Sequence, residues 1–272
     1  MLSSRGKYVR TTSELVYRLR DLLGGRRPLM LCTDVDGVLT VSRASYELDL
    51  KVVGLLRELR EHGLPICLAS ATAYPTVRCL IRYLGLSRLA IAEDGCIIDV
   101  YGKRLHLTSR SAREVVKEVA KRFNLTESWQ NQYRHHDFAL ELVESRVLRE
   151  EAQLVASRVK EYVERNYSWL RTVYTGFAIH IHPVECSKEN ALRKLVSILG
   201  FDLSRVIAVG DSNVDAGILE VAGVGIAVGD ADDEAKRAAD IVVELPASKA
   251  TIVVLESLIK YMREASSSPT SP

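Results

Sequence analysis

The chain has 272 residues, of which 47% are hydrophobic and 26% are charged. This length suits one large globular domain or two moderate ones. Its 37 basic and 35 acidic residues nearly cancel, which argues against nucleic acids and membrane surfaces as partners, and no apolar run reaches the roughly 20 residues of a membrane span.

A capping signal near the N-terminus predicts one helix within residues 1–27. Thr11 and Glu14 have the spacing of a capping box, leucines recur on one face behind them, and Gly24-Gly25 would end the helix. The N-terminal residues do not contain the apolar core of a signal peptide. We therefore expect a helical extension that packs on the core, with a dimer contact as the alternative.

Residues 28–95 alternate between apolar strands and helices in the order βαβαβ. This alternation favours a doubly wound sheet of parallel strands, in which ligands bind at the carboxyl ends of the strands. The predicted strands cover 29–33, 64–69 and 88–92, and the predicted helices cover about 48–62 and 75–84.

The first of these strands leads directly into the segment Asp34-Val-Asp-Gly-Val-Leu-Thr40. Asp34 and Asp36 would share one face because strand side chains alternate in direction, and Gly37 would let the chain turn sharply. Two carboxylates at the end of a parallel strand can bind a divalent cation and a phosphate. The alternative is an acidic turn that only caps the strand.

Residues 96–186 show a different pattern, in which strands follow strands and two helices are interspersed. Such a pattern indicates an α+β unit with an antiparallel sheet. The predicted elements are a hairpin of 97–100 and 104–107, a helix after residue 111, a strand at 137–143, a helix near 147–165, and strands at 168–174 and 177–182.

Several histidines of this inserted unit could contact a ligand. His180 and His182 are two residues apart on a predicted strand and would lie on one face. For His180 we favour a hydrogen-bonded histidine at an interface over a contact with the substrate. Zinc binding by the pair is a further alternative, but it would need a third ligand that the sequence does not indicate. Arg134, His135 and His136 could meet a substrate carboxylate, although a solvated turn is the favoured interpretation.

From residue 187 the alternation of helices and strands returns. The core would therefore consist of residues 28–95 and 187–265, followed by residues 266–272 as a disordered tail of serine, proline and threonine. The predicted helices are 188–199, 214–222, 232–239 and 248–264, and the predicted strands are 205–209, 224–228 and 240–244.

The acidic turn after the first strand has counterparts at the ends of other strands. Asp211 follows an apolar strand, Asp215 would lie in the first turn of the next helix, Ser70 ends the second strand, and Lys188 follows the last strand of the insert. A hydroxyl donates to a phosphate, an ammonium neutralises it, and carboxylates can hold magnesium. Helix capping by the acids and Ser70, and a solvated surface lysine, are the alternatives.

Together these motifs resemble those of the haloacid dehalogenase superfamily of phosphohydrolases. The resemblance covers about residues 28–245 and implies a Rossmann-like α/β core, with residues 96–186 as an inserted α+β cap of the second type. It rests on Asp34-x-Asp36, Ser70, Lys188 and Gly210-Asp211-Ser-x-x-Asp215.

Two further segments are similar to signatures of one branch of that superfamily. The branch holds archaeal phosphoglycolate phosphatases and the sucrose-phosphatase-like and Cof-like sugar phosphatases. The segments are Glu93-Asp-Gly95 and Gly225-Ile-Ala-Val-Gly-Asp-Ala231, the latter followed by Lys236.

The resemblance implies hydrolysis of a phosphomonoester through an aspartyl-phosphate. Asp34 would attack phosphorus, and Asp36 would protonate the leaving oxygen and then activate water. Ser70 and Lys188 would bind the phosphoryl oxygens and stabilise their charge in the transition state. The cap would determine the choice of substrate and exclude water from the site.

The implied cofactor is Mg²⁺, which the carboxylates of Asp34, Asp211 and Asp215 and the backbone carbonyl of Asp36 would bind. The side chain of Asp36 would point away from the metal because it must carry a proton at the start of the reaction. The expected partner is a small phosphorylated metabolite, bound by a cytoplasmic monomer or homodimer.

The first expectation for the substrate is 2-phosphoglycolate, and sugar phosphates, sucrose phosphate and mannosyl-phosphoglycerate are alternatives. A hypothesis of another class is a non-catalytic phosphometabolite-binding protein that kept the fold. Its support is that Thr72, Asp94, Val214 and Asp230 stand where the resembled branch usually has other residues, mostly asparagine. The intact acids and Lys188 argue against it.

The five cysteines show no Cys-x-x-Cys spacing. Cys32 and Cys67 lie in predicted strands and are expected to be small core residues. An odd number of scattered thiols favours a reducing cytosol.

Overall fold

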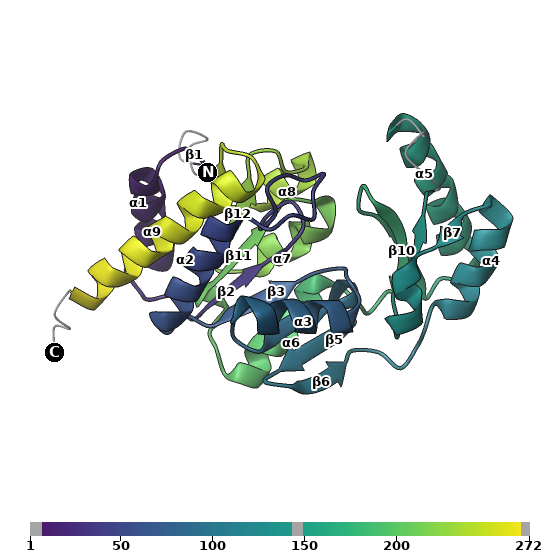
Figure 1. Ribbon diagram of the computed structural model, residues 1–272, viewed down its shortest axis with the longest axis horizontal. Coiled ribbons are helices and arrows are strands. Elements are labelled where there is room, and N and C mark those ends of the chain that lie inside the picture. The colour runs from purple at the N-terminus through teal and green to yellow at the C-terminus, as the bar shows by residue number, and fades with distance from the viewer. Residues whose placement is uncertain (1–6, 143–148, 268–272) are drawn as a thin grey trace.

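The computed structural model describes residues 7–142 and 149–267, which form a larger α/β part and a smaller α+β part (Figure 1). The larger part, the core, contains a nine-stranded sheet, and the smaller part, the cap, contains a four-stranded sheet. Each part encloses its own cluster of buried apolar side chains. The expected fold class, a mostly parallel α/β core with an inserted α+β cap, is confirmed.

The core sheet has the strand order β1-β13-β12-β11-β2-β3-β4-β5-β6. Neighbouring strands from β1 to β4 in this order are parallel, and β5 and β6 add an antiparallel hairpin at one edge. The inner strands are buried along their whole length, as in parallel sheets with helices on both faces. The strands are β1 (Tyr8–Val9), β2 (Met30–Thr33), β3 (Ile66–Ala69), β4 (Leu89–Ala92), β5 (Ile97–Val100), β6 (Lys103–His106), β11 (Val206–Gly210), β12 (Val224–Val228) and β13 (Ile241–Val243).

The helices of the core form two packed groups. Helix α9 packs against α1 and α2, which lie beside it in Figure 1, and α7 packs against α6 and α8. The helices are α1 (Thr12–Leu23), α2 (Leu50–Glu61), α3 (Tyr74–Leu84), α6 (Lys188–Leu199), α7 (Ala216–Val221), α8 (Asp233–Ala238) and α9 (Ala247–Ser267).

The helix predicted near the N-terminus is confirmed as α1. Thr11 accepts a hydrogen bond from the backbone of Glu14, whose carboxylate accepts from the Thr11 backbone, so the capping box is formed. The buried face of α1 packs on α9. Strand β1 was not predicted; its two residues pair with β13, so the core sheet begins before residue 28. A strand this short carries no periodic signal in the sequence.

The cap consists of an antiparallel sheet and two helices. The sheet order is β7-β8-β10-β9, and the helices supply apolar side chains to a cluster that also includes Phe138 and Ile179. The elements are α4 (Arg113–Phe123), β7 (Thr126–Glu127), β8 (Phe138–Glu141), α5 (Arg149–Asn166), β9 (Leu170–Tyr174) and β10 (Ala178–Pro183). Residues 143–148, where the predicted strand 137–143 would end and the predicted helix 147–165 would begin, lie outside the described residues.

The hairpin of β5 and β6 is one point at which the prediction was wrong. We expected it within the cap, since the cap was taken to begin at residue 96, but β5 pairs with β4 and extends the core sheet. The hairpin pattern in the sequence reports only the local pairing of β5 with β6. Which sheet the hairpin joins depends on the contact with β4.

Two of the five cysteines form a disulfide, which the sequence did not indicate. Cys96, before β5, is bonded to Cys186, before α6, while Cys32, Cys67 and Cys79 are free. The bond therefore links the segment between β4 and β5 of the core to the segment between the last cap strand, β10, and α6.

At the C-terminus, α9 continues through residues 266 and 267, which we had assigned to a disordered tail. Residues 268–272, the rest of that predicted tail, lie outside the described residues. Within the ranges 7–142 and 149–267, no helix combines the length and apolar character that crossing a membrane requires.

Candidate active site

Three of the predicted residues lie side by side at the carboxyl ends of adjacent core strands. Strand β2 pairs with β11 on one side and β3 on the other, and these strands are followed by Asp34, Asp211 and Ser70. Lys188 reaches the same place from the end of the last strand of the insert, as predicted. It is the first residue of α6 and follows β10, a strand of the cap sheet, instead of a strand of the core sheet.

The centre of the site is a cluster of three buried carboxylates around one ammonium group. Oxygen atoms of Asp34, Asp211 and Asp215 lie within 4.8 Å of one another. The Lys188 Nζ atom is 2.6 Å from Oδ1 of Asp34 and 2.6 Å from Oδ1 of Asp215. Because Lys188 is only 2% exposed, the alternative of a solvated surface lysine is wrong.

Asp215 both organises its own turn and faces Lys188. Its Oδ2 accepts hydrogen bonds from the backbone amides of Asp211 and Ser212 and from the Ser212 hydroxyl, at 3.1, 3.1 and 2.9 Å. The capping role considered as an alternative is therefore real, and it leaves Oδ1 for the ammonium group. Gly210 allows this arrangement, since a Cβ atom there would lie 2.5 Å from the Asp215 Cβ.

Asp36 lines the same cavity as Asp34 but lies outside the cluster of three carboxylates. Burial raises its pKa, which favours a protonated carboxyl group. Between the two acidic turns, Gly37 adopts a φ of 76°, and a Cβ atom there would lie 2.3 Å from Oδ2 of Asp211. Only glycine therefore permits this turn to approach Asp211 so closely.

The raised pKa values of two acids in the cluster indicate that it lacks positive charge. Burial and the neighbouring Asp215 raise the pKa of Asp211 to about 7, although Arg43 opposes the shift. Burial also raises the pKa of Asp34 well above its ordinary value, against the effect of Lys188. A divalent cation would compensate these charges, and a set of carboxylate oxygens is the donor type that Mg²⁺ prefers. The residues present therefore fit a magnesium ion.

Arg43 is a residue of the site that the sequence did not reveal. Its Nε lies 2.6 Å from Oδ2 of Asp211, and its Nη1 donates to Asp232 at 2.9 Å and to the carbonyl of Asp230 at 3.0 Å. Arg43 therefore ties the loop after the first acidic turn to the loop after β12. It follows Asp36 by seven residues in a segment without a regular pattern, so no sequence signal marks it.

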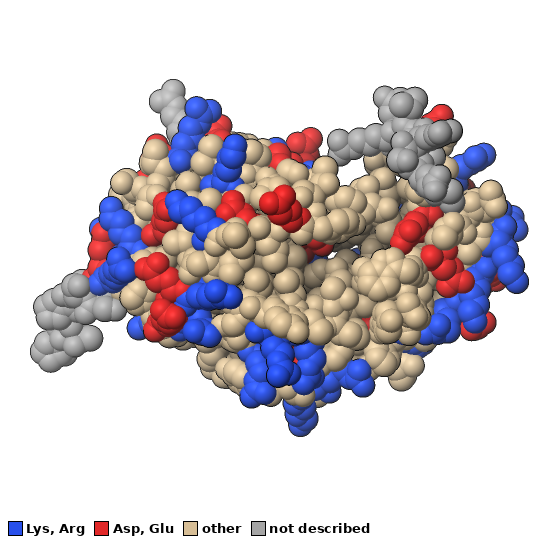
Figure 2. Space-filling model, in the orientation of Figure 1, with Lys and Arg blue, Asp and Glu red and all other residues tan. Residues whose placement is uncertain are grey.

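Ser70 is buried and lines the same cavity as Asp34 and Asp36. Its hydroxyl oxygen accepts a hydrogen bond from the Thr72 amide at 3.1 Å, but the N-cap residue of α3 is Ala73, so Ser70 does not cap that helix. The cavity has a volume of about 410 Å³ and lies between core and cap, where the space-filling view is hollowed (Figure 2). The cap contributes Trp129, Arg134 and His180 to its wall.

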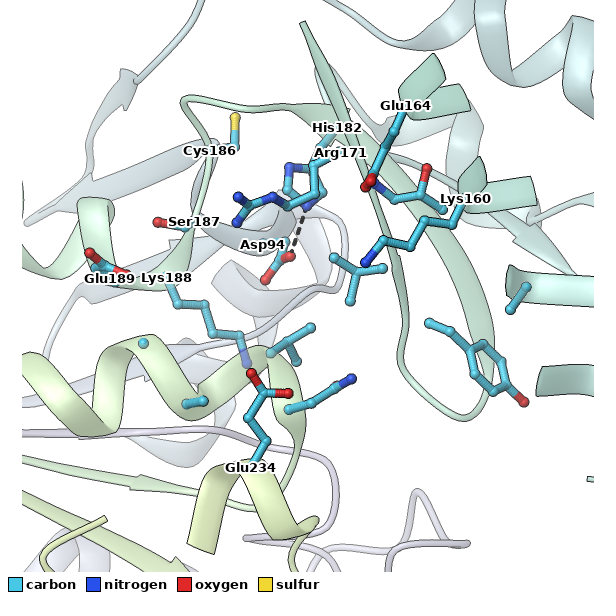
Figure 3. A pocket seen from close by; sticks show the side chains of 18 of the residues that line it. Asp94, Lys160, Glu164, Arg171, His182, Cys186, Ser187, Lys188, Glu189 and Glu234 are labelled. Carbon is cyan, nitrogen blue, oxygen red and sulfur yellow. Dashed lines mark hydrogen bonds and ion pairs between the residues drawn. The ribbon is translucent and has the colours of Figure 1, made fainter. Parts of the chain in front are cut away.

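A second cavity of about 550 Å³ reaches Lys188 from another side (Figure 3). Its wall includes Arg171 of the cap and the buried pair of Asp94 and His182, whose Oδ2 and Nε2 atoms are 3.1 Å apart. His182 is therefore an interface histidine, as we favoured. Asp94, one of the departures from the resembled branch, supplies its counter-charge, and it adopts a φ of 49° beside Gly95.

This ion pair should make stability depend on pH in two separate ranges. Burial lowers the pKa of His182, but Asp94 reverses this and raises it from 6.5 to about 9; burial raises the pKa of Asp94, but His182 lowers it from 3.8 to about 2. The contribution of the histidine is complete below pH 6.5 and is lost as the pH rises to about 9. That of the aspartate is complete above pH 3.8 and is lost as the pH falls to about 2.

Thermal unfolding measured across this range should therefore show a loss of about 3 kcal/mol between pH 6.5 and 9 in the wild type. The His182→Gln variant should be less stable at pH 6 and should lose little more up to pH 9. Parallel stability curves of the two proteins over pH 6–9 would contradict the assignment.

The segment that we expected to be a solvated turn, residues 134–136, is partly buried against the core. Arg134 is 4% exposed and His136 is 7% exposed. The backbone amides of His135 and His136 each donate to the Glu93 carboxylate at 2.9 Å. The predicted solvated turn is therefore wrong, because the sequence does not show that Glu93 of the core meets this segment.

A family model described as haloacid dehalogenase-like hydrolase matches residues 31–141 and 121–253. The phosphoglycolate phosphatase of Staphylothermus marinus is 34% identical over 230 residues, which cover 83% of this chain and 95% of that protein. The phosphoglycolate phosphatase of Pyrobaculum neutrophilum is 39% identical over 218 residues, which cover 80% of this chain and 90% of that protein.

Solved structures show the same fold. A protein of Thermoplasma acidophilum superposes with a TM-score of 0.73 at 20% identity, covering 87% of this chain and 100% of that one. A haloacid dehalogenase-like hydrolase from Bacteroides thetaiotaomicron superposes with a TM-score of 0.69 at 18% identity, covering 86% of this chain and 99% of that one.

Proposed function

Because this chain belongs to the family of haloacid dehalogenase-like hydrolases and is a phosphatase, we propose that it hydrolyses a small phosphorylated metabolite through an aspartyl-phosphate, with Mg²⁺ as cofactor. The observation that carries the proposal is the contact of one buried lysine, Lys188, with both Asp34 and Asp215 at 2.6 Å. This contact places a fixed cation beside a carboxylate at the bottom of a cavity, as phosphoryl transfer to that carboxylate requires.

Asp34 is the proposed nucleophile. One of its carboxylate oxygens would form a bond to phosphorus while the bond from phosphorus to the leaving oxygen breaks. Its Oδ1 faces Lys188, and its backbone amide donates to the carbonyl of Val209 at 2.9 Å, which fixes the residue at the end of β2. The attacking group is therefore held in place before the substrate binds.

Asp36 is the proposed general acid and base. Its raised pKa, caused by burial, favours the protonated form that must give a proton to the leaving oxygen. The resulting carboxylate would then take a proton from the water that attacks the aspartyl-phosphate, so that phosphate leaves and both acids return to their initial states. Asp36 suits this role because it lines the cavity without joining the carboxylate cluster.

Lys188 and Ser70 are proposed to bind the phosphoryl oxygens. Burial by itself lowers the pKa of Lys188, but Asp215, Asp34 and Asp94 together raise it well above its ordinary value, so the ammonium group stays charged. Its charge would stabilise the negative charge that accumulates on the phosphoryl group, while the hydroxyl of Ser70 donates a hydrogen bond.

Asp34, Asp211 and Asp215 would hold Mg²⁺, together with the backbone carbonyl of Asp36. When bound, the ion supplies neutralisation of the phosphate charge and of the acids that surround it. Arg43 and Lys188 already balance part of that charge, which keeps the acids in position.

The Asp211→Asn variant should bind Mg²⁺ at least about 100-fold more weakly, since loss of a ligand exceeds the effect of losing an outer-shell partner. Calorimetric titration with Mg²⁺ and the dependence of turnover on Mg²⁺ concentration would both measure this. Asp202→Asn, an exposed aspartate in a turn before β11, serves as the matched control and should titrate like the wild type. Equal Mg²⁺ affinities for all three proteins would remove Asp211 from the metal site.

The proposed substrate is 2-phosphoglycolate, after the names of the relatives, and the proposed location is the cytoplasm. The direct test is phosphate release from 2-phosphoglycolate, glucose 6-phosphate, sucrose phosphate and mannosyl-phosphoglycerate, each with Mg²⁺ and with excess EDTA. Turnover that needs Mg²⁺ and is fastest with 2-phosphoglycolate is expected. Phosphate release that persists in EDTA would contradict the cofactor, and preference for a sugar phosphate would contradict the substrate.

A further inference from the structure

The cap wall of the catalytic cavity carries a buried cluster of one carboxylate and two nitrogen-bearing side chains. Asp137 is fully buried. Its Oδ2 atom forms an ion pair with Nη1 of Arg134 and a hydrogen bond of 2.8 Å with Nδ1 of His180. Arg134 and His180 both line the cavity and are 4% and 6% exposed. None of these three residues has a role in the phosphoryl transfer described above.

The hydrogen-bond donors that this cluster leaves unused favour an anion as its ligand. Burial raises the pKa of Asp137, but His180 and Arg134 outweigh it and lower the pKa, so the carboxylate stays ionised. Its Oδ2 faces both Nη1 of Arg134 and Nδ1 of His180, which orients the imidazole ring. Nε of Arg134 is buried without a hydrogen-bond partner among the described residues. The hydrogen bonds found for Arg134 use Nη1 and the one found for His180 uses Nδ1, so Nε and Nη2 of Arg134 and Nε2 of His180 remain as donors for a ligand.

The other cations of the cavity are already matched by acids. Lys188 lies between Asp34 and Asp215, and Arg43 lies between Asp211 and Asp232. Each of those cations contacts two acids. By contrast, Arg134 and His180 both contact the same carboxylate, that of Asp137.

The cluster is also held at a fixed, short distance from the phosphate site. Nη1 of Arg134 donates to the carbonyl of Ala71, the residue after Ser70, at 2.9 Å. Gln130 of the cap accepts a hydrogen bond from the Ala73 amide at 3.1 Å, so two cap residues contact the loop that carries Ser70. A ligand whose phosphate binds at Ser70 would need only a few bonds to reach Arg134.

We propose that Arg134 and His180 form the subsite for the carboxylate of the substrate, with Asp137 as the residue that positions both side chains. The inference rests on the proposed phosphatase function and deepens it. The enzyme selects short phosphorylated acids over phosphate esters of the same length that carry a hydroxyl group in place of the carboxylate. A guanidinium group can bind a carboxylate with two parallel hydrogen bonds, which a neutral hydroxyl group cannot match.

The test compares 2-phosphoglycolate with 2-hydroxyethyl phosphate, in which a hydroxymethyl group replaces the carboxylate. A site built for a charged hydrogen-bond partner rejects an analogue that lacks it, so the wild type should prefer 2-phosphoglycolate in kcat/KM by about 100-fold. Arg134→Met should lower kcat/KM for 2-phosphoglycolate by about 100-fold and His180→Gln by about tenfold. Both variants should change kcat/KM for 2-hydroxyethyl phosphate by less than about threefold.

Arg171→Met is the matched control, because Arg171 is an arginine of the same cap that lines the second cavity instead of the catalytic one (Figure 3). It should leave both substrates unaffected. A loss of activity on 2-phosphoglycolate in this variant alone would place the carboxylate in the second cavity and overturn the proposal.

Two other results would also overturn the proposed subsite. Equal losses on both substrates in Arg134→Met and in His180→Gln would mean that these residues only hold the Ser70 loop and the cap in place. Equal use of both substrates by the wild type would mean that the carboxylate is not recognised.

Failure of the phosphatase proposal itself would look different, since the wild type would then hydrolyse neither compound. In that case the affinity for 2-phosphoglycolate, measured by calorimetry in the wild type and in Arg134→Met, would test the subsite. Binding that Arg134→Met weakens would support the subsite, and binding that the variant leaves unchanged would overturn it.

Discussion

Replacing Asp34 with asparagine should lower kcat for phosphate release by about 10⁴-fold or more, because an amide has nearly the same shape as a carboxylate but is a poor nucleophile. The loss should fall on kcat, since Ser70 and Lys188 still bind the phosphate. The fold should remain intact, because Lys188 keeps Asp215 as a partner at 2.6 Å. The pKa of Asp34 is raised well above its ordinary value by burial, so removing its charge should leave stability equal or higher.

Single-turnover phosphate release and thermal unfolding of the variant would measure both effects. Asp202→Asn is again the control for the same chemical change at an exposed position. Residual activity within tenfold of the wild type would exclude Asp34 as the nucleophile. A large drop in the unfolding temperature would show instead that Asp34 is needed for the structure of the site.

Replacing Cys186 with serine should lower the free energy of unfolding by about 4 kcal/mol, which is the second large effect that we expect. The disulfide joins residues 90 positions apart and so restricts the unfolded chain across the whole cap. Both sulfur-bearing residues are fully buried, so the serine hydroxyl would also lack water. For a chain of this size the change corresponds to about 10 °C in unfolding temperature.

The unfolding temperature should be measured with and without a reductant. The wild type should lose stability in the reductant, whereas Cys186→Ser should not respond further. Cys79→Ser, which changes an exposed free thiol, should behave as the wild type does. If wild type and Cys186→Ser unfold at the same temperature without reductant, the bond does not form in solution.

Local patterns in the sequence were enough to predict the parts of this protein whose cause is local. Helix α6 and strand β12 have the predicted bounds, 188–199 and 224–228, because caps, turns and apolar periodicity act within a few residues. The two acidic turns were recognisable for the same reason, since each consists of neighbouring residues at the end of an apolar strand. The order of strands and helices was enough to predict a parallel core with an inserted unit.

Contacts between residues far apart in the chain could be seen only in the folded protein. The hairpin of β5 and β6 joins the core through β4, and Cys96 meets Cys186 across the whole cap. Likewise, Asp94 meets His182 and Arg43 meets Asp211, although 88 and 168 positions separate them (182 − 94 and 211 − 43). Whether a charged side chain is solvated or buried in an ion pair depends on its partner in space, and no local pattern in the sequence records that partner.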